Sequence, residues 1–233
     1  CAATENIFPL LTSNYGCALD AFTFRQLEPW LQNKPHLVVE FDEHRGEAGL
    51  MTRLEAFIDQ LNNVGQRRYE VREPACLPAS VAMIPEKTAP VFMPYWSDYV
   101  YAYAGIWEHV GYNVEILPLP EPNIRLLGEK YSLGKECSPY AMVVGDLIQL
   151  HHANPERELV YHFPSVTFPC LLTQYGNNIQ LLLRELGIRN IRLSSLTGTD
   201  LTRAFGLSEM QLLYEGLLAI DALVKASCET RAY

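Results

Sequence analysis

The chain lacks an apolar run long enough to cross a membrane, and it lacks a secretory leader. None of its 233 residues falls in a stretch of about 18 consecutive apolar residues, as a transmembrane helix would require. No positively charged start is followed by an apolar segment. We therefore predict a cytoplasmic location without membrane contact. Because the chain starts at Cys1 in a segment that resembles folded sequence, we expect it to be a piece of a longer polypeptide.

Basic residues are scarce, and the common nucleotide and hydrolase motifs are missing. Eighteen Lys and Arg face 27 Asp and Glu, which gives a net charge of −9. Without a basic cluster, we predict no nucleic-acid partner. No G-x-G-x-x-G, G-x-x-x-x-G-K-S/T or G-x-S-x-G motif occurs, so nucleotide pockets and serine nucleophiles of those kinds are not encoded.

The six cysteines form no C-x-x-C run and no closely spaced framework. A chain of this length without a secretory signal rarely depends on disulfides, so we expect free thiols in a reducing compartment. Each thiol is then available for metal binding or for packing as a small buried hydrophobe. The cysteines stand at positions 1, 17, 76, 137, 170 and 228.

What the sequence does contain is an alternation of short apolar runs and helical patterns. This alternation predicts an α/β fold with a parallel sheet and covering helices. We predict the C-terminal part of one α/β unit at 1–65, a linker at 66–90 and a second α/β unit at 91–233. The predicted strands are 8–13, 36–41, 91–93, 113–117, 159–163 and 190–193. The predicted helices are 18–31, which Pro29 should end or kink, 52–62, 99–110, 140–152, 177–186 and a long one opening at Ser208. Thr52 with Glu55 and Ser208 with Gln211 have the spacing of capping boxes, and the predicted core face of the last helix is Leu213, Leu217, Ile220 and Val224.

Three cysteines stand in similar loops, each just before a predicted helix. Cys17 follows Asn-Tyr-Gly, Cys137 follows Gly-Lys-Glu, and Cys170 follows Phe-Pro. Ligands of open α/β sheets bind where strands end and helices begin. A helix N-terminus lowers the pKa of a nearby thiol and favours an anionic cluster. The pattern therefore makes an iron–sulfur cluster one candidate for these loops, beside the packing role.

The residues around these cysteines resemble a known superfamily. Gly134-Lys-Glu-Cys-Ser-Pro139 with Gly145-Asp146, Pro169-Cys170 with Gln174-Tyr175, and Asn14-Tyr-Gly-Cys-Ala-Leu-Asp20 occur in the same order as its three cysteine motifs. Val39-Glu-Phe-Asp-Glu-His44 and Thr52-Arg-Leu-Glu-Ala-Phe57 extend the likeness. Together they resemble the 2-hydroxyacyl-CoA dehydratase and benzoyl-CoA reductase superfamily, and most closely its large activase-related proteins.

The resemblance implies Rossmann-like or flavodoxin-like α/β units, with a parallel sheet and helices on both faces, that hold an oxygen-sensitive 4Fe–4S cluster on Cys17, Cys137 and Cys170. It also implies an ATP-hydrolysing activase domain or subunit as electron donor, and an acyl-CoA as a candidate substrate. The sequence leaves open a single or double cubane and the oligomeric state, and we expect air to remove the cluster. Phe168 and Leu171 stand where the family usually has glycine and arginine. These differences keep an alternative open: a non-catalytic α/β interaction or scaffold module that has lost the cluster.

The charged loop from Asp42 to Glu47 supports a third hypothesis, an enzyme that uses a different metal. Carboxylates and the His44 imidazole are suitable ligands or proton donors, so His44 is a candidate catalytic residue. A solvated loop that precedes the next helix is the simpler interpretation. Cys76 lies in the predicted linker, and we interpret Cys228 as a structural residue of the last helix.

Overall fold

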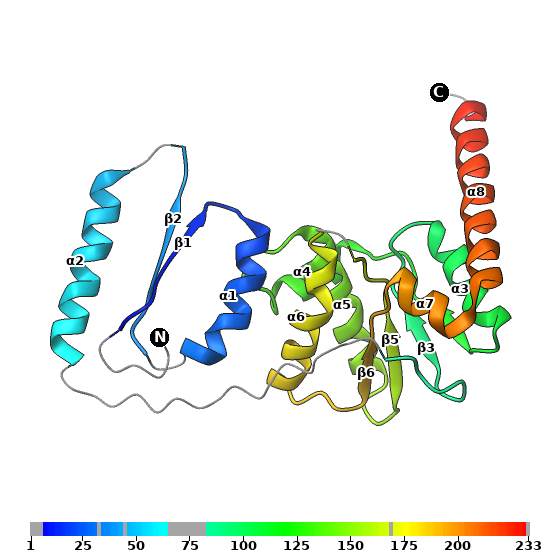
Figure 1. Ribbon diagram of the computed structural model, residues 1–233, viewed down its shortest axis with the longest axis horizontal. Helices are drawn as coiled ribbons and strands as arrows, with labels where there is room; N and C mark the ends of the chain where they lie inside the picture. Colours follow the sequence, from blue (N-terminus) through cyan, green and yellow to red (C-terminus); the bar gives the residue numbers. More distant parts are fainter. Residues whose placement is uncertain (1–6, 32–33, 44–45, 65–82, 168–169, 232–233) are drawn as a thin grey trace. The chain divides into compact units, whose positions relative to one another are not determined.

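The computed structural model describes residues 7–31, 34–43, 46–64, 83–167 and 170–231, and the chain forms two units (Figure 1). One unit comprises Cys1–Leu77 together with Leu133–Cys137. The other comprises Pro78–Ser132 and Ser138–Tyr233. Residues 65–82, which include most of the predicted linker at 66–90, lie outside the described residues. The short Leu133–Cys137 segment groups with the first unit although it is flanked in sequence by the second.

The first unit is a pair of parallel strands with two helices. Strands β1 (Leu10–Asn14) and β2 (Leu37–Phe41) run in register from Leu10 opposite Leu37 to Asn14 opposite Phe41. Both strands lie within two residues of their predicted positions. Helix α1 spans Ala18–Leu31, which are the predicted bounds, so Pro29 does not end it early.

Helix α2 (Glu47–Val64) begins five residues before the predicted start. The predicted capping box at Thr52 is therefore wrong, because Thr52 lies inside the helix and not at its start. The Thr52 hydroxyl donates to the Ala48 carbonyl at 2.9 Å, which is an ordinary contact inside a helix rather than a cap.

The second unit is built on a four-stranded, all-parallel sheet in the order β4-β3-β5-β6. Its strands read as short apolar runs because parallel strands are covered on both faces. This arrangement confirms the predicted α/β fold class. The strands are β3 (Val91–Met93), β4 (Val114–Ile116), β5 (Leu159–His162) and β6 (Ile191–Ser194).

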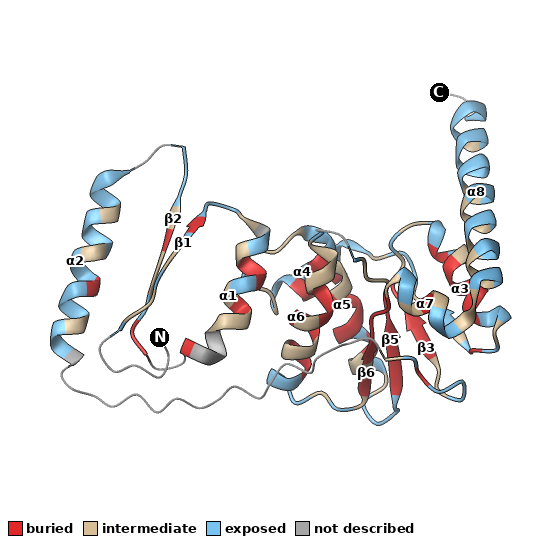
Figure 2. Ribbon diagram, in the orientation of Figure 1, coloured by how far each residue is buried: buried red, intermediate tan, exposed pale blue. Residues whose placement is uncertain are grey.

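In the part of the chain that the structure describes, six helices of the second unit cover the two faces of this sheet (Figure 1). The chain steps from β3 to β4 in one direction and then reverses past β3 to β5 and on to β6, so the first crossover falls on one face and the next two fall on the other. Buried residues concentrate on the strands and on α5 between the layers (Figure 2). One face carries α4 (Pro122–Glu129), α5 (Ser138–Ala153) and α6 (Leu172–Glu185); the other carries α3 (Tyr99–His109), α7 (Gly198–Phe205) and α8 (Leu207–Thr230).

Helices α4 and α5 approach so closely that two glycines are required. A Cβ atom on Gly128 of α4 would lie 1.7 Å from the Ala141 carbonyl oxygen of α5. A Cβ atom on Gly145 of α5 would lie 2.0 Å from the Ile124 carbonyl oxygen of α4. Backbone atoms cannot rotate away from such a contact, so this crossing has no room for any side chain.

The sequence did not predict α4 or α7, and it misplaced a cap. A complete capping box is formed at Thr197, whose hydroxyl accepts from the Asp200 N–H while the Asp200 carboxylate accepts from the Thr197 N–H. Ser208, the predicted cap of the last helix, instead donates to the Glu209 carboxylate inside α8.

The predicted core face of α8 is only partly correct. Leu213, with Met210, packs against the core of the unit. No described residue of α8 is buried, however, and Val224, predicted to face the core, is 41% exposed. The C-terminal half of α8 therefore leaves apolar side chains in contact with solvent.

Candidate functional site

Each of the three predicted cysteines lies beside the start of a helix. Cys17 immediately precedes α1, and its carbonyl accepts from the Ala21 N–H at 3.1 Å. Cys137 immediately precedes α5. Cys170 stands two residues before α6 and accepts at its carbonyl from the Thr173 N–H and hydroxyl, at 3.1 and 2.7 Å. Cys170 is exposed, and the other two cysteines are half-buried.

The element that precedes Cys137 in the chain differs from the prediction, which placed this cysteine at the end of a strand. Helix α4 lies between β4 and the Cys137 loop, so this cysteine does not follow directly from a strand end. Its segment, Leu133–Cys137, belongs to the same unit as Cys17, whereas Cys170 belongs to the other unit.

Lys135 ties the Cys137 loop to the first unit. Its ammonium group lies 2.6 Å from the Glu40 carboxylate on β2 and 5.9 Å from the centre of the Phe24 ring on α1. The adjacent Glu136 carboxylate accepts from the Leu133 and Lys135 N–H groups at 3.0 and 3.2 Å. A closed turn thus places a positive charge two residues from Cys137.

The donor chemistry of these residues fits an iron–sulfur cluster, since cysteine sulfurs beside helix N-termini are suitable ligands. Within the part of the chain that the structure describes, no three His, Cys, Asp or Glu side chains are grouped closely enough to hold a metal ion. The ligand set of Cys17, Cys137 and Cys170 stays a prediction.

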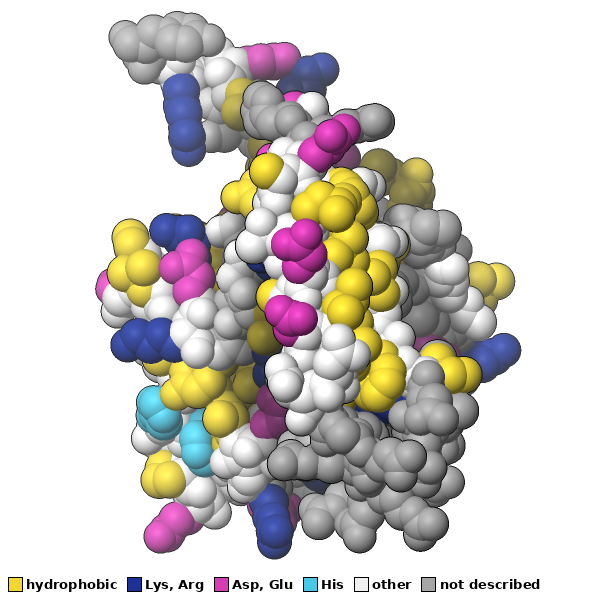
Figure 3. Space-filling model, turned by 90° about the vertical axis from the view of Figure 1, so that its left-hand side faces the viewer, with side chains coloured by type: hydrophobic (Ala, Val, Ile, Leu, Met, Phe, Trp, Pro, Cys, Tyr) yellow, Lys and Arg dark blue, Asp and Glu magenta, His cyan; other side chains and the backbone are white. Residues whose placement is uncertain are grey.

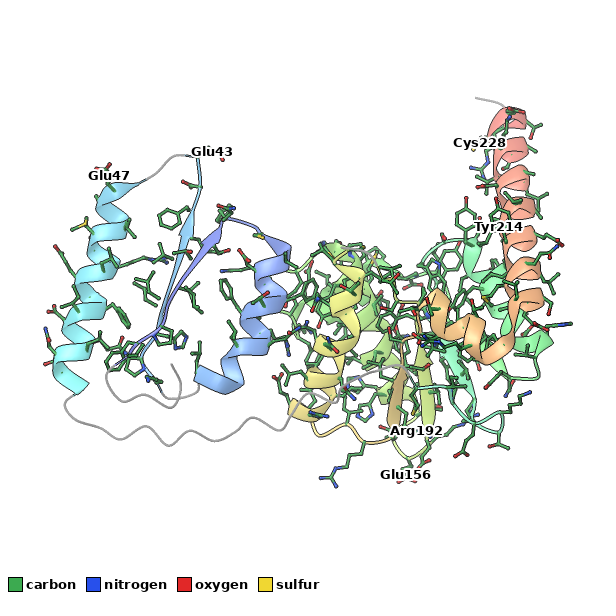
Figure 4. All side chains as sticks on the ribbon, in the orientation of Figure 1. Glu43, Glu47, Glu156, Arg192, Tyr214 and Cys228 are labelled. Atoms are coloured by element: carbon green, nitrogen blue, oxygen red, sulfur yellow. The ribbon has the colours of Figure 1, made fainter. Side chains whose placement is uncertain are left out.

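The charged loop borders a hollow of about 840 Å³ in the first unit. Its walls include Tyr15, Glu40, Asp42, Glu43 and Arg53. Glu43 and Glu47 stand at the same end of the unit, where the loop enters α2 (Figure 4). His44 lies outside the described residues, as does Cys76, so the hypotheses placed on them are untested. Cys228 was predicted to be structural; it is exposed near the end of α8.

A buried polar chain in the second unit was not predicted. The Ser194 hydroxyl donates to the Met83 carbonyl at 2.7 Å, so its oxygen accepts from His162 Nδ1–H at 2.9 Å. His162 Nε2 therefore accepts from the Tyr103 hydroxyl at 3.0 Å. This order assigns a neutral imidazole, and burial lowers the pKa of His162 to about 3. These hydrogen bonds are buried in the core, so their role is to fix β5 against α3 and β6.

A second unpredicted group is Asp146, in the middle of α5. Its exposed fraction is 6%, and burial raises the pKa of its carboxyl to about 7. In the sequence, Gly145-Asp146 stands out only as part of the motif around Cys137. The burial of this carboxyl comes from long-range packing, which no local pattern signals.

Comparisons with known proteins find nothing similar. No protein-family model matches the chain, and no curated protein or solved structure matches it significantly. Among the helices that the structure describes, none has both the length and the apolar content needed to cross a membrane.

Proposed function

We propose that this chain is an iron–sulfur electron-transfer module of an ATP-dependent acyl-CoA dehydratase activase-related system. The observation that carries the proposal is the common placement of Cys17, Cys137 and Cys170, each of which lies beside the start of a helix in an α/β chain. At such positions the backbone N–H groups and the helix dipole stabilise an anionic cluster.

The 4Fe–4S cluster, single or linked as a double cubane, would supply one-electron transfer at low potential. The chain's own residues would hold it and set its surroundings. Lys135 adds a positive charge near the Cys137 thiolate, and its pairing with Glu40 fixes the loop. An ATP-hydrolysing activase would be the electron donor, an acyl-CoA the candidate acceptor, and the reducing cytoplasm the setting.

The proposal is tested by metal content. The chain is expressed anaerobically and reconstituted with iron and sulfide. Iron per chain, visible absorption and the EPR spectrum of the reduced protein are then recorded. We expect Cys137→Ser and Cys170→Ser each to lose the iron and the EPR signal. Cys228→Ser is the matched control, because this exposed cysteine lies near the C-terminal end of α8 and not at the start of a helix, and it should keep both.

Two results contradict the proposal. One is a chain with native circular dichroism that takes up no iron. The other is iron that persists unchanged in the Cys17, Cys137 and Cys170 variants alike.

The first of these results favours the second candidate, an α/β interaction or scaffold module without a cluster. Exposed apolar side chains support this candidate. They run along α2 (Figure 3), where Met51 and Ile58 are 53% and 55% exposed. On α8, Leu223 and Val224 are 69% and 41% exposed. Exposed apolar patches of this kind mark surfaces that bind other proteins.

A further inference from the structure

The second unit contains a pocket that the cysteine hypothesis does not involve. It lies beside the edge strand β4, against α5, and has a volume of about 380 Å³. The turn from Leu117 to Glu121 forms one wall, and the last turns of α5 form another. This volume lies at the small end of the range for small-molecule sites.

A buried carboxyl group lines this pocket without a partner. Asp146 is 6% exposed, and across the described residues its carboxylate accepts no hydrogen bond and forms no ion pair. The nearby Tyr161 hydroxyl does not satisfy it, since that group donates to the Val143 carbonyl at 2.9 Å. The Asp146 oxygens are not among the fully buried side-chain atoms of the described residues that lack a hydrogen-bond partner, so they are open to the pocket, where an occupant can pair with them.

The charges around the pocket favour a positively charged partner for Asp146. Glu115 on β4 and Glu121 before α4 add two carboxylates, while Arg157 after α5 is the single cationic side chain of the lining. Apolar walls from Phe92, Leu117 and Leu150 would suit a short hydrocarbon chain, so the complementary occupant is a cation with an apolar part.

A metal ion does not fit this description. The carboxylates of the pocket are not grouped in threes, because no such cluster of donors occurs in the part of the chain that the structure describes. We propose that this pocket binds a small organic cation, a primary ammonium on a short apolar chain, with Asp146 as its counter-ion. The site is independent of the iron–sulfur proposal and stands whether or not a cluster is present.

The experiment measures butylammonium binding to the full chain at pH 8 by isothermal titration calorimetry. We expect Asp146→Asn to weaken binding at least tenfold, because the isosteric amide keeps the shape and removes the charge. Glu156→Gln is the matched control. It makes the same change in net charge at an exposed position that does not line the pocket, and should alter affinity less than twofold.

A pH series supplies a second measurement that needs no variant. Burial raises the pKa of Asp146 to about 7, so the carboxyl is mostly protonated at pH 5.5 and binding by the wild type should weaken about tenfold there. Glu115, Glu121, Arg157 and Tyr161 are the other charged or titratable groups around it. The same series on Asp146→Asn isolates their contribution.

Three results overturn the proposal. Butylammonium fails to bind the folded wild type; or Asp146→Asn binds it as tightly as the wild type; or the neutral analogue 1-butanol binds as tightly as butylammonium. In the last case the pocket recognises the hydrocarbon and not the charge.

Discussion

The glycine contact between α4 and α5 makes a sharp prediction for Gly145→Ala. The new Cβ would lie 2.0 Å from the Ile124 carbonyl oxygen, against a practical minimum of 3.0 Å, so the two helices must separate by about 1 Å. Overpacking of this kind costs about 1–3 kcal/mol, and the upper end applies because the opposing atom is backbone. The higher helix propensity of alanine returns about 1 kcal/mol. We expect the free energy of unfolding to fall by about 2 kcal/mol.

The assay is urea unfolding followed by tryptophan fluorescence, to which the fully buried Trp107 contributes. Gly105→Ala is the control in the same unit. Gly105 is an exposed residue of α3 with no atom within 4 Å of the added Cβ, so alanine should stabilise it by about 0.5–1 kcal/mol. If Gly145→Ala is as stable as Gly105→Ala, the close crossing of α4 and α5 is refuted.

Two further predictions concern the buried polar groups of the second unit. Ser194→Ala leaves His162 Nδ1 and the Met83 carbonyl without partners, and should lower the free energy of unfolding by about 2–3 kcal/mol. Ser195→Ala next to it breaks no side-chain hydrogen bond that the structure contains and should change it little; equal losses would contradict the hydrogen-bond order given above. For Asp146, burial raises the folded pKa to about 7 from 3.8, so the folded chain binds this proton more tightly and stability falls as pH rises from about 4 to 7. Asp146→Asn should remove this loss and be more stable than the wild type by on the order of 2–4 kcal/mol at pH 8, with little gain at pH 4. Urea midpoints at both pH values measure it, and parallel pH profiles of the two proteins would count against the raised pKa.

The strands were predictable because of their burial. Parallel strands covered on both faces must be apolar along their length, so runs such as Val91–Met93 and Leu159–His162 are visible in the sequence. The short helices were not. Helix α4 has only eight residues, with Pro122 in its first turn and Gly128 near its end, which together resemble a loop. Two of the predicted caps were accidental, because Ser or Thr three residues before Glu or Gln also occurs inside helices.

The candidate sites also differ in how far the sequence predicts them. A cysteine next to a helix start is a local feature, and the sequence predicts a helix after each of Cys17, Cys137 and Cys170, although the helix after Cys170 begins at Leu172, five residues earlier than predicted. The pocket around Asp146 depends on how α5 packs against β4 and the loop before α4. That packing joins segments some 30 residues apart and leaves no periodic pattern in any of them.

The Lys135–Glu40 ion pair has a consequence for the order in which the protein is made. Its two residues are 95 positions apart, and the segment from Leu133 to Cys137 returns to a unit whose other strands and helices come earlier in the chain. Since synthesis proceeds from the N-terminus, the first unit emerges incomplete, and its last segment follows only after residues 78–132 have been made. A fragment that ends before Leu133 therefore lacks part of the first unit, wherever its other boundary is placed.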